Sequence, residues 1–212
     1  KKEKLIPMNY QALEAGLNYA REHFDCPLGI RLERRDAIGD RIMLDGNAAC
    51  ALGAIYAGAT VAAWYPITPS TSVVDAFSKY AKRLRTDQAT GSKKYAIVQA
   101  EDELAAMGVV IGAMWNGARA FTATSGPGVS LMNEFIGLAY FAEIPAVLID
   151  VQRGGPSTGM PTRTQQSDIL LAAYASHGDT KQVLLFPSDP NECFNMSADA
   201  FDLAARPQTP IM

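Results

Sequence analysis

Residues 61–84 read VAAWYPITPSTSVVDAFSKYAKRL, an apolar run followed by a hydroxyl-rich loop and a longer mixed segment. The run VAAWYPI is typical of a buried strand. In the loop, Thr68 and Ser70 are residue types that cap helix N-termini, and Pro69 suits a first helical turn. This stretch therefore predicts a strand, a loop and a helix, in that order.

The same strand–helix unit recurs along the chain. Further strand-like runs are RIMLDG (41–46), KYAIVQA (94–100), ARAFTATS (118–125), PAVLIDVQ (145–152), KQVLLFP (181–187) and the start of one in TPIM (209–212). Such alternation predicts an α/β fold, a three-layer doubly wound parallel sheet with helices on both faces. Because ligands bind these sheets at the carboxyl ends of strands, the functional residues should directly follow YP, VQA, TATS and VQR.

The first 40 residues differ from the rest. A helical pattern runs from Tyr10 to Phe24, and a stretch broken by proline and glycine follows it. We therefore predict a tail or linker from a preceding domain in residues 1–40 and one α/β domain in residues 41–212. Since the first residue is not Met and TPIM resembles a strand start, we expect the chain to be a piece of a longer protein.

Composition excludes several classes of function. Net charge is −3 and Lys and Arg form no large cluster, which argues against binding to nucleic acid or to an anionic membrane. No apolar run approaches the roughly 20 residues that span a bilayer. The three cysteines are scattered without a C-x-x-C pair, so no zinc or iron–sulfur spacing is present, and a reducing cytoplasm is the expected location.

Two segments carry candidate anion-binding or acid–base residues. Thr68, Ser70 and the N–H groups of the following helix suit an anion, although a plain N-cap is the commoner use of such residues. In QAEDELAAMGVVIGA, three acids precede a helix of apolar and small residues. The helix dipole alone favours acids there, but the buried character of the helix could give one of Glu101, Asp102 and Glu103 a role in holding a proton.

Two later segments also end strands in polar residues. Thr124 and Ser125 precede a tight Gly-Pro-Gly turn, which lacks the G-K-[ST] of a P-loop. Arg153 follows the apolar run PAVLIDVQ and opens a long loop, where it could clamp a carboxylate or serve as a structural ion-pair partner. His177 could carry a proton, although a loop histidine bonded to Asp179 is the plainer interpretation.

These segments, taken together, resemble a known family. DGNAACALGAIYAG, YPITPSTS, EDELAAMGVVIGA, TSGPGVSLMNE and RGGPSTGMPTRTQQSD follow the order found in α subunits of 2-oxoacid:ferredoxin oxidoreductases, and are most similar to the 2-oxoglutarate type. The resemblance covers about residues 41–212 and implies the pyrimidine-binding fold of thiamine diphosphate enzymes. The N-terminal helix resembles the end of the γ domain that some members fuse ahead of the α part.

The resemblance implies an activity and a set of site residues. The activity is thiamine diphosphate-dependent oxidative decarboxylation of a 2-oxoacid, with transfer of the acyl group to coenzyme A and reduction of ferredoxin. Glu103 would bond the pyrimidine nitrogen that drives cofactor activation, because the glycines five and nine residues later match the family register; Glu101 is the fallback. The other implied contacts are Thr68 and Arg153 with the substrate's carboxylate and carbonyl end, Thr124 and Ser125 in the same cleft, and Pro66 and Ile67 with the cofactor.

Departures from the complete family pattern point to a partner. The G-D-G…N motif for Mg²⁺ and diphosphate is absent, and so are cluster cysteines. In the family both belong to the β subunit, so Mg²⁺ and a [4Fe-4S] cluster are expected there, in an (αβ)2 assembly without which this chain is inactive. Pyruvate and branched-chain enzymes are built alike, so the sequence does not identify the 2-oxoacid, and Arg163 is only a candidate for binding a distal substrate carboxylate.

Two other interpretations fit less well. A transketolase-like or decarboxylase pyrimidine domain usually has an aromatic slot and different loops. A non-catalytic anion- or nucleotide-binding α/β module is the alternative from another class, but its Rossmann form requires G-x-G-x-x-G after the first strand. DGNAACALG does not supply that motif.

Overall fold

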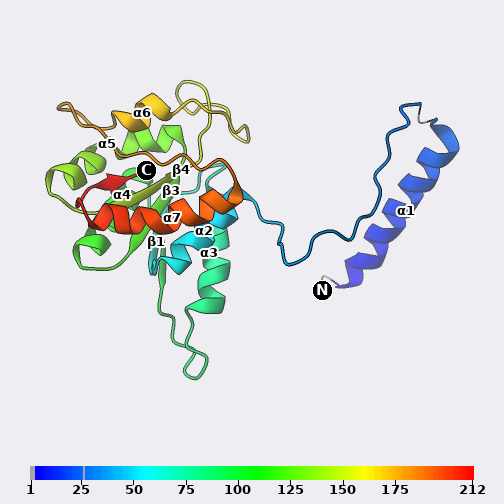
Figure 1. Cartoon of the computed structure of the whole chain (residues 1–212), viewed down its shortest axis with the longest axis horizontal. Helices are drawn as coiled ribbons and strands as arrows, with labels where there is room; N and C mark the ends of the chain where they lie inside the picture. The colour runs from blue at the N-terminus through cyan, green and yellow to red at the C-terminus, as the bar shows by residue number, and fades with distance from the viewer. Residues whose placement is uncertain (1–2, 26) are drawn as a thin grey trace. The chain divides into compact units, whose positions relative to one another are not determined.

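The computed structural model describes residues 3–25 and 27–212, which form two compact units, Lys1–Ile42 and Met43–Met212. The first unit contains a short 3-10 helix, Glu3–Leu5, and helix α1, Ile6–His23 (Figure 1). The helix predicted from Tyr10 is therefore present and begins a turn earlier, with a proline in its first positions. None of the described side chains of α1 is buried.

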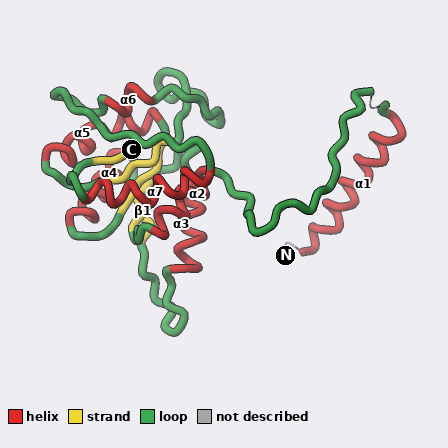
Figure 2. The backbone as a smooth tube through the Cα atoms, viewed as in Figure 1, coloured by secondary structure: helices red, strands yellow, loops and turns green. Residues whose placement is uncertain are grey.

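The second unit is built on a five-stranded parallel sheet (Figure 2). Its strands, in the spatial order β2-β1-β3-β4-β5, are Ala96–Gln99, Val61–Trp64, Ala120–Thr124, Ala146–Asp150 and Pro210–Ile211. The chain passes from β1 to one neighbour, β2, and then returns to the other side of β1 as β3. The β1/β3 boundary is thus the topological switch point, where open α/β sheets bind ligands.

Helices cover both faces of the sheet, which confirms the predicted three-layer α/β fold. The helices of this unit are α2 (Gly46–Tyr56), α3 (Thr71–Leu84), α4 (Glu103–Trp115), α5 (Gly126–Phe141), α6 (Ile169–Ala173) and α7 (Pro190–Ala205). Buried side chains of α2, α3 and α7 form one apolar cluster with the sheet, and those of α4 and α5 form the other. Helices α2 and α7 lie side by side, close enough that a methyl group on Gly53 would overlap a backbone carbonyl of α7.

Alternate strand residues serve the two clusters. Ala62 packs in the first cluster and Ala63 in the second, as the period of two along a strand requires. On β3, Phe121 packs between the rings of Phe77 and Phe201, at centroid distances of 5.0 and 6.4 Å. The central strand is therefore buried on both sides, as parallel strands between two helical layers are.

Two predicted strands are wrong or incomplete. Residues 41–45 are irregular rather than a strand, and Asp45 caps α2 by accepting the N–H of Ala48 at 2.8 Å. KQVLLFP forms only one isolated bridge, Val183 to Ile211, since its neighbour β5 is itself two residues long. Ser70 also differs from its predicted capping role: it precedes α3, but its hydroxyl donates to the Ile67 carbonyl at 3.0 Å.

Candidate functional site at the carboxyl ends of the strands

The predicted site residues follow four adjacent strands. Thr68 lies after β1, Glu103 after β2, Ser125 after β3 and Arg153 after β4. Because the strands are parallel, their carboxyl ends meet at one edge of the sheet. That edge includes the switch point between β1 and β3, so topology alone places these loops around one site.

Arg153 connects two of these loops. Its side chain is buried, with 6% exposed, and its Nη1 donates to the backbone carbonyl of Thr68 at 2.8 Å. The Nε atom donates to the carbonyl of Thr158 at 2.8 Å, and Nη2 contacts the same oxygen. Arg153 is therefore held by backbone carbonyls on both sides, while the Thr68 side chain itself is exposed.

Glu103 is the buried acid of the EDE run. It is the first residue of α4 and only 6% exposed, whereas Glu101 is exposed and Asp102 caps the helix by accepting the N–H of Ala105. A methyl group on Gly128 would lie 2.8 Å from Glu103 Cγ and would overlap the Thr124 hydroxyl. The glycine thus allows Glu103, Thr124 and the start of α5 to pack together.

Ser125 adds an unused donor beside these residues. Thr124 and Ser125 are both fully buried, and Ser125 Oγ has no hydrogen-bond partner within the described part of the chain. A buried hydroxyl without a partner costs free energy, so such a group often marks a ligand position.

The remaining predicted residues are more exposed. Pro66 is exposed and Ile67 is half-buried; the Ile67 carbonyl is fixed by the hydroxyl groups of Ser70 and Thr71 at 3.0 and 3.1 Å. Arg163 and His177 are exposed in loops, and the bonds described for residues 3–25 and 27–212 do not include one between His177 and Asp179. No role for His177 follows from this geometry.

Sequence reasoning missed two acids near Arg153. Asp168 is 7% exposed and accepts the backbone N–H of Arg153 at 2.9 Å. Asp150 ends β4, and its Oδ1 is buried without a partner in the residues that the structure covers. Burial, together with the charge of Asp168, raises the pKa of Asp150 to about 7. A charged residue inside the apolar run PAVLIDVQ was the available signal.

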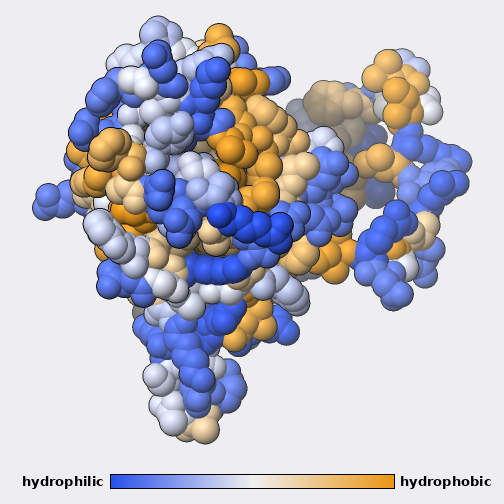
Figure 3. Space-filling view, turned by 60° about the vertical axis from the view of Figure 1, so that its left-hand side comes forward, coloured by the Kyte–Doolittle hydropathy of each residue, from blue (hydrophilic) through white to orange (hydrophobic). Residues whose placement is uncertain are grey.

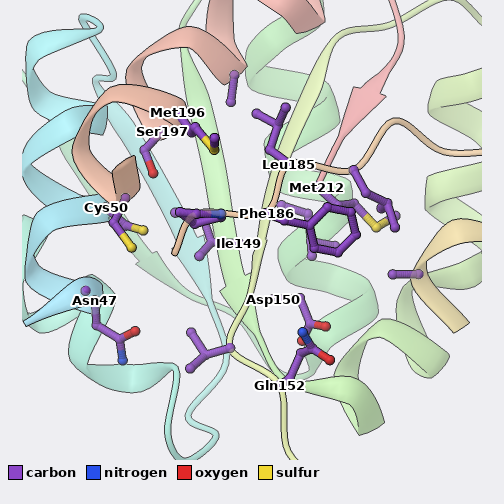
Figure 4. Close-up of a pocket in the computed structure, with 18 of the residues that line it drawn as sticks. Asn47, Cys50, Ile149, Asp150, Gln152, Leu185, Phe186, Met196, Ser197 and Met212 are labelled. Carbon is purple, nitrogen blue, oxygen red and sulfur yellow. The ribbon is translucent and has the colours of Figure 1, made fainter. Parts of the chain in front are cut away.

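A cavity of the second unit lies beside Asp150 but apart from the predicted site residues. It has a volume of about 520 Å³ and lies among β4, β5, α2, α7 and the segment 184–188 (Figure 4). Leu185, Phe186 and Met212 give it an apolar wall, and Asn47 and Gln152 a polar rim. Its lining does not include Glu103, Thr124, Ser125, Thr68 or Arg153. The predicted site residues therefore lie outside this cavity, where the loops after β1, β2, β3 and β4 meet.

A family model described as pyruvate flavodoxin/ferredoxin oxidoreductase, thiamine diphosphate-binding, matches residues 52–212. The chain belongs to this family. The sequence-based resemblance is thereby confirmed, and the thiamine diphosphate-binding family domain covers every predicted site residue from Pro66 to Arg153.

Relatives of this oxidoreductase family are similar over most of the chain. The 2-oxoglutarate synthase subunit KorA of Methanothermobacter thermautotrophicus is 46% identical over 173 residues, covering 82% of this chain and 44% of that protein. The α subunit of 2-oxoacid:ferredoxin oxidoreductase 2 of Aeropyrum pernix is 42% identical over 221 residues, covering all of this chain and 34% of its own length.

A solved structure is also similar. It is the 2-oxoglutarate:ferredoxin oxidoreductase of Magnetococcus marinus with 2-oxoglutarate, coenzyme A and succinyl-CoA bound, at 36% identity and a TM-score of 0.81. The match covers 98% of this chain and 35% of that one. The chain thus spans less than half the length of each of these three oxidoreductase-family proteins.

The residues present fit thiamine diphosphate, the cofactor that domains of this family bind. A buried carboxylate, Glu103, can accept a hydrogen bond from a ring nitrogen, and the Ser125 hydroxyl, which bonds to none of the described residues, offers a further donor. Within residues 3–25 and 27–212, the structure contains no cluster of three or more His, Cys, Asp or Glu side chains suited to a metal ion. None of the helices described there is both long and apolar enough to cross a membrane.

Asp150 makes the stability of this oxidoreductase-family chain depend on pH. Its pKa rises from an ordinary 3.8 to about 7 in the folded protein, so between these values the native state binds more protons than the unfolded state. Stability therefore falls as the pH rises through this window. Because Asn stays neutral, we expect Asp150→Asn to raise the free energy of unfolding by on the order of 2 kcal/mol at pH 8, and much less at pH 4.

Urea unfolding of the purified protein at both pH values measures this difference. The exposed Asp199→Asn is the matched control and should change stability little at either pH. An equal effect of Asp150→Asn at pH 4 and pH 8 would contradict the assignment of a raised pKa to Asp150.

Proposed function

We propose that the chain is the pyrimidine-binding part of the α subunit of a 2-oxoacid:ferredoxin oxidoreductase. The enzyme would convert a 2-oxoacid and coenzyme A to acyl-CoA and CO₂ and reduce ferredoxin. The observation that carries the proposal is the buried Glu103 carboxylate, packed beside Thr124 at the sheet edge where Arg153 meets Thr68. Membership of a thiamine diphosphate-binding oxidoreductase family supports it.

Glu103 would hold the pyrimidine end of the cofactor. Thiamine diphosphate, when bound, supplies the carbanion chemistry by which a 2-oxoacid loses CO₂. Glu103 would exchange a proton with the ring nitrogen. Because Glu103 is buried, water would not compete for its carboxylate. Pro66 and Ile67, beside the switch point, would contact the ring, and the bonds to the Ile67 carbonyl keep that loop in place.

Arg153 would bind the carboxylate of the 2-oxoacid. A guanidinium has five N–H donors, and the bonds to Thr158 and Thr68 leave part of this set free for an anion. The exposed Thr68 side chain and the buried hydroxyls of Thr124 and Ser125 would complete the contacts to the carboxylate and carbonyl end.

The substrate we propose is 2-oxoglutarate. The support is that similar proteins are named 2-oxoglutarate synthase or 2-oxoglutarate:ferredoxin oxidoreductase. Residues 1–40 would be the end of a fused γ-type domain, which agrees with the Aeropyrum α subunit matching the whole chain. The scattered cysteines favour a cytoplasmic enzyme.

A β subunit would complete the site. The sequence lacks G-D-G…N and clustered cysteines, so we propose that the diphosphate grip, Mg²⁺ and a [4Fe-4S] cluster are contributed by that partner in an (αβ)2 assembly. The naming of similar proteins as subunits supports a multi-subunit enzyme.

Co-expression of the full-length protein with a β-type partner tests the function. We expect ferredoxin reduction that requires thiamine diphosphate, coenzyme A and 2-oxoglutarate, with pyruvate a poorer substrate and the α chain alone inactive. If the assembled enzyme bound thiamine diphosphate but none of the 2-oxoacids supported ferredoxin reduction, the proposed function would be wrong. Activity with pyruvate alone would overturn only the proposed substrate.

A further inference from the structure

The loop that begins at Arg153 is long, and nearly all of it is exposed. From Arg153 to Ser167 only Arg153 and Gly154 are buried. An exposed loop of this length has little apolar contact to hold it. Since the guanidinium of Arg153 is nonetheless placed at the Thr68 carbonyl, other bonds must hold the base of the loop.

The side chain of Gln152, just after β4, bonds to the far end of the loop. It lies where the chain leaves β4, next to Asp150 (Figure 4). Its side-chain Oε1 accepts the backbone N–H groups of Ser167 and Asp168, at 2.9 and 3.0 Å. One side chain thus joins the segment that leaves β4 to the end of the loop.

The side chain of Asp168, at the end of the loop, bonds back to the residue at its start. Its Oδ2 accepts the backbone N–H of Arg153 at 2.9 Å, across 15 residues, and its Oδ1 accepts the Ser167 hydroxyl at 3.2 Å. Asp168 precedes α6, yet its side chain makes no capping bond to that helix. Its buried carboxylate is therefore used for the loop rather than as an ordinary N-cap.

Asp168 also contacts the neighbouring strand–helix unit. A methyl group on Gly126 would lie 2.7 Å from Asp168 Oδ2 and overlap its Oδ1, so the carboxylate packs directly on the first residue of α5. The positive end of that helix favours a negative charge there. Asp168 hence links the end of β4, which carries Arg153, to the end of β3, which carries Ser125.

We propose that Asp168 and Gln152 are positioning residues that tie the base of the 153–167 loop and thereby hold Arg153 in the substrate-binding site. The inference rests on the proposed function, because it takes Arg153, which these bonds hold in place, to be a substrate-binding residue. Neither side chain needs to touch the substrate. Each acts through the backbone of the loop, and Arg153 then reaches Thr68 from a fixed Cα position.

The test compares Asp168→Ala, Asp168→Asn and the exposed-site control Asp75→Ala in the full assembled enzyme. Asparagine keeps an oxygen acceptor for the Arg153 N–H, whereas alanine removes it. For Asp168→Ala we expect the hydrogen-bonded backbone amides of this loop, those of Arg153, Met160, Gln165 and Ser167, to exchange hydrogen at least about 10-fold faster, while amides of α3 are unchanged. We also expect KM for the 2-oxoacid to rise about 10-fold or more, with a smaller change in kcat.

Asp168→Asn and Asp75→Ala should both stay close to the wild type in exchange and in KM. Unchanged exchange in Asp168→Ala would overturn the proposal. So would an Asp168→Asn variant that loses kcat while its loop stays protected, since that result would make Asp168 a direct proton carrier. If Asp168→Ala does not assemble, Gln152→Ala against Gln152→Glu poses the same question, because glutamate retains the acceptor oxygen.

Hydrogen exchange is measured without substrate, so it tests the tie even if the enzyme acts on no 2-oxoacid. A wild-type enzyme that is inactive with every 2-oxoacid would reject the proposed function. A loop that exchanges faster only in Asp168→Ala would support the tie in either case.

Discussion

Replacement of Glu103 by Gln is expected to lower the turnover of the assembled enzyme by at least about 100-fold, because Gln cannot exchange a proton with the pyrimidine nitrogen. Glutamine has nearly the same shape as glutamate, so the packing of the side chain against Gly128 and Thr124 should be retained. Folding and subunit assembly are therefore expected to remain normal. The measurement is 2-oxoglutarate-dependent ferredoxin reduction, with thiamine diphosphate binding followed separately.

Glu101→Gln is the matched control for this substitution. Glu101 lies two residues earlier in the same run and is exposed. The substitution Glu101→Gln therefore removes the same charge without changing the buried site. We expect its turnover to be near that of the wild type. Turnover near the wild type in Glu103→Gln, with a loss in Glu101→Gln, would transfer the role to Glu101. Near-normal turnover in both would reject an activating carboxylate in this run.

Arg153→Ala is expected to reduce kcat/KM for the 2-oxoacid by about 100-fold or more, roughly 3 kcal/mol of lost binding. The reason is twofold. The substrate carboxylate would lose its cationic partner, and the carbonyls of Thr68 and Thr158 would lose the donors that join their loops. Steady-state kinetics with varied 2-oxoacid measures the first loss.

Two variants show whether charge or geometry matters. Arg153→Lys keeps the charge but cannot donate from separate Nε and Nη1 atoms to two carbonyls, so it should recover only part of the activity. Arg83→Ala removes an exposed arginine of α3 and should change kcat/KM little. If Arg153→Ala retained wild-type KM and kcat, Arg153 would be a structural residue of the loop and not a substrate ligand.

Most of the fold could be predicted from local sequence. Runs such as AIVQ, AFTAT and AVLID are apolar and separated by helical segments, and this alternation permits little but a parallel sheet covered on both faces. The failures were at RIMLDG, where Asp45 caps α2 instead, and at KQVLLFP, whose neighbour β5 is only two residues long. Local apolarity favours a strand, but the ladder of hydrogen bonds requires a neighbour.

One surface feature also depends on the folded state. Apolar side chains gather in a broad band on the face seen in Figure 3, among hydrophilic ones. In the second unit the exposed large apolar residues include Leu131, Leu138, Leu170, Tyr174 and Phe186. Their sequence positions do not distinguish them from core residues, because α5 also carries buried side chains such as Met132 and Ile136. Which face of a helix is covered depends on the elements that pack against it.

The sequence by itself determined the class of fold, the family, and the placement of Thr68, Glu103, Ser125 and Arg153 at one sheet edge. This was possible because parallel strands must bring their carboxyl ends together, whatever the packing details. Tertiary structure alone decided that Glu103 rather than Glu101 is buried, since that depends on how α4 lies against α5 and β3. It also decided the role of Asp168, which belongs to no recognisable motif and lies 15 residues after Arg153. Asp168 bonds the Arg153 backbone and packs on α5, because only folding brings the two ends of that loop together.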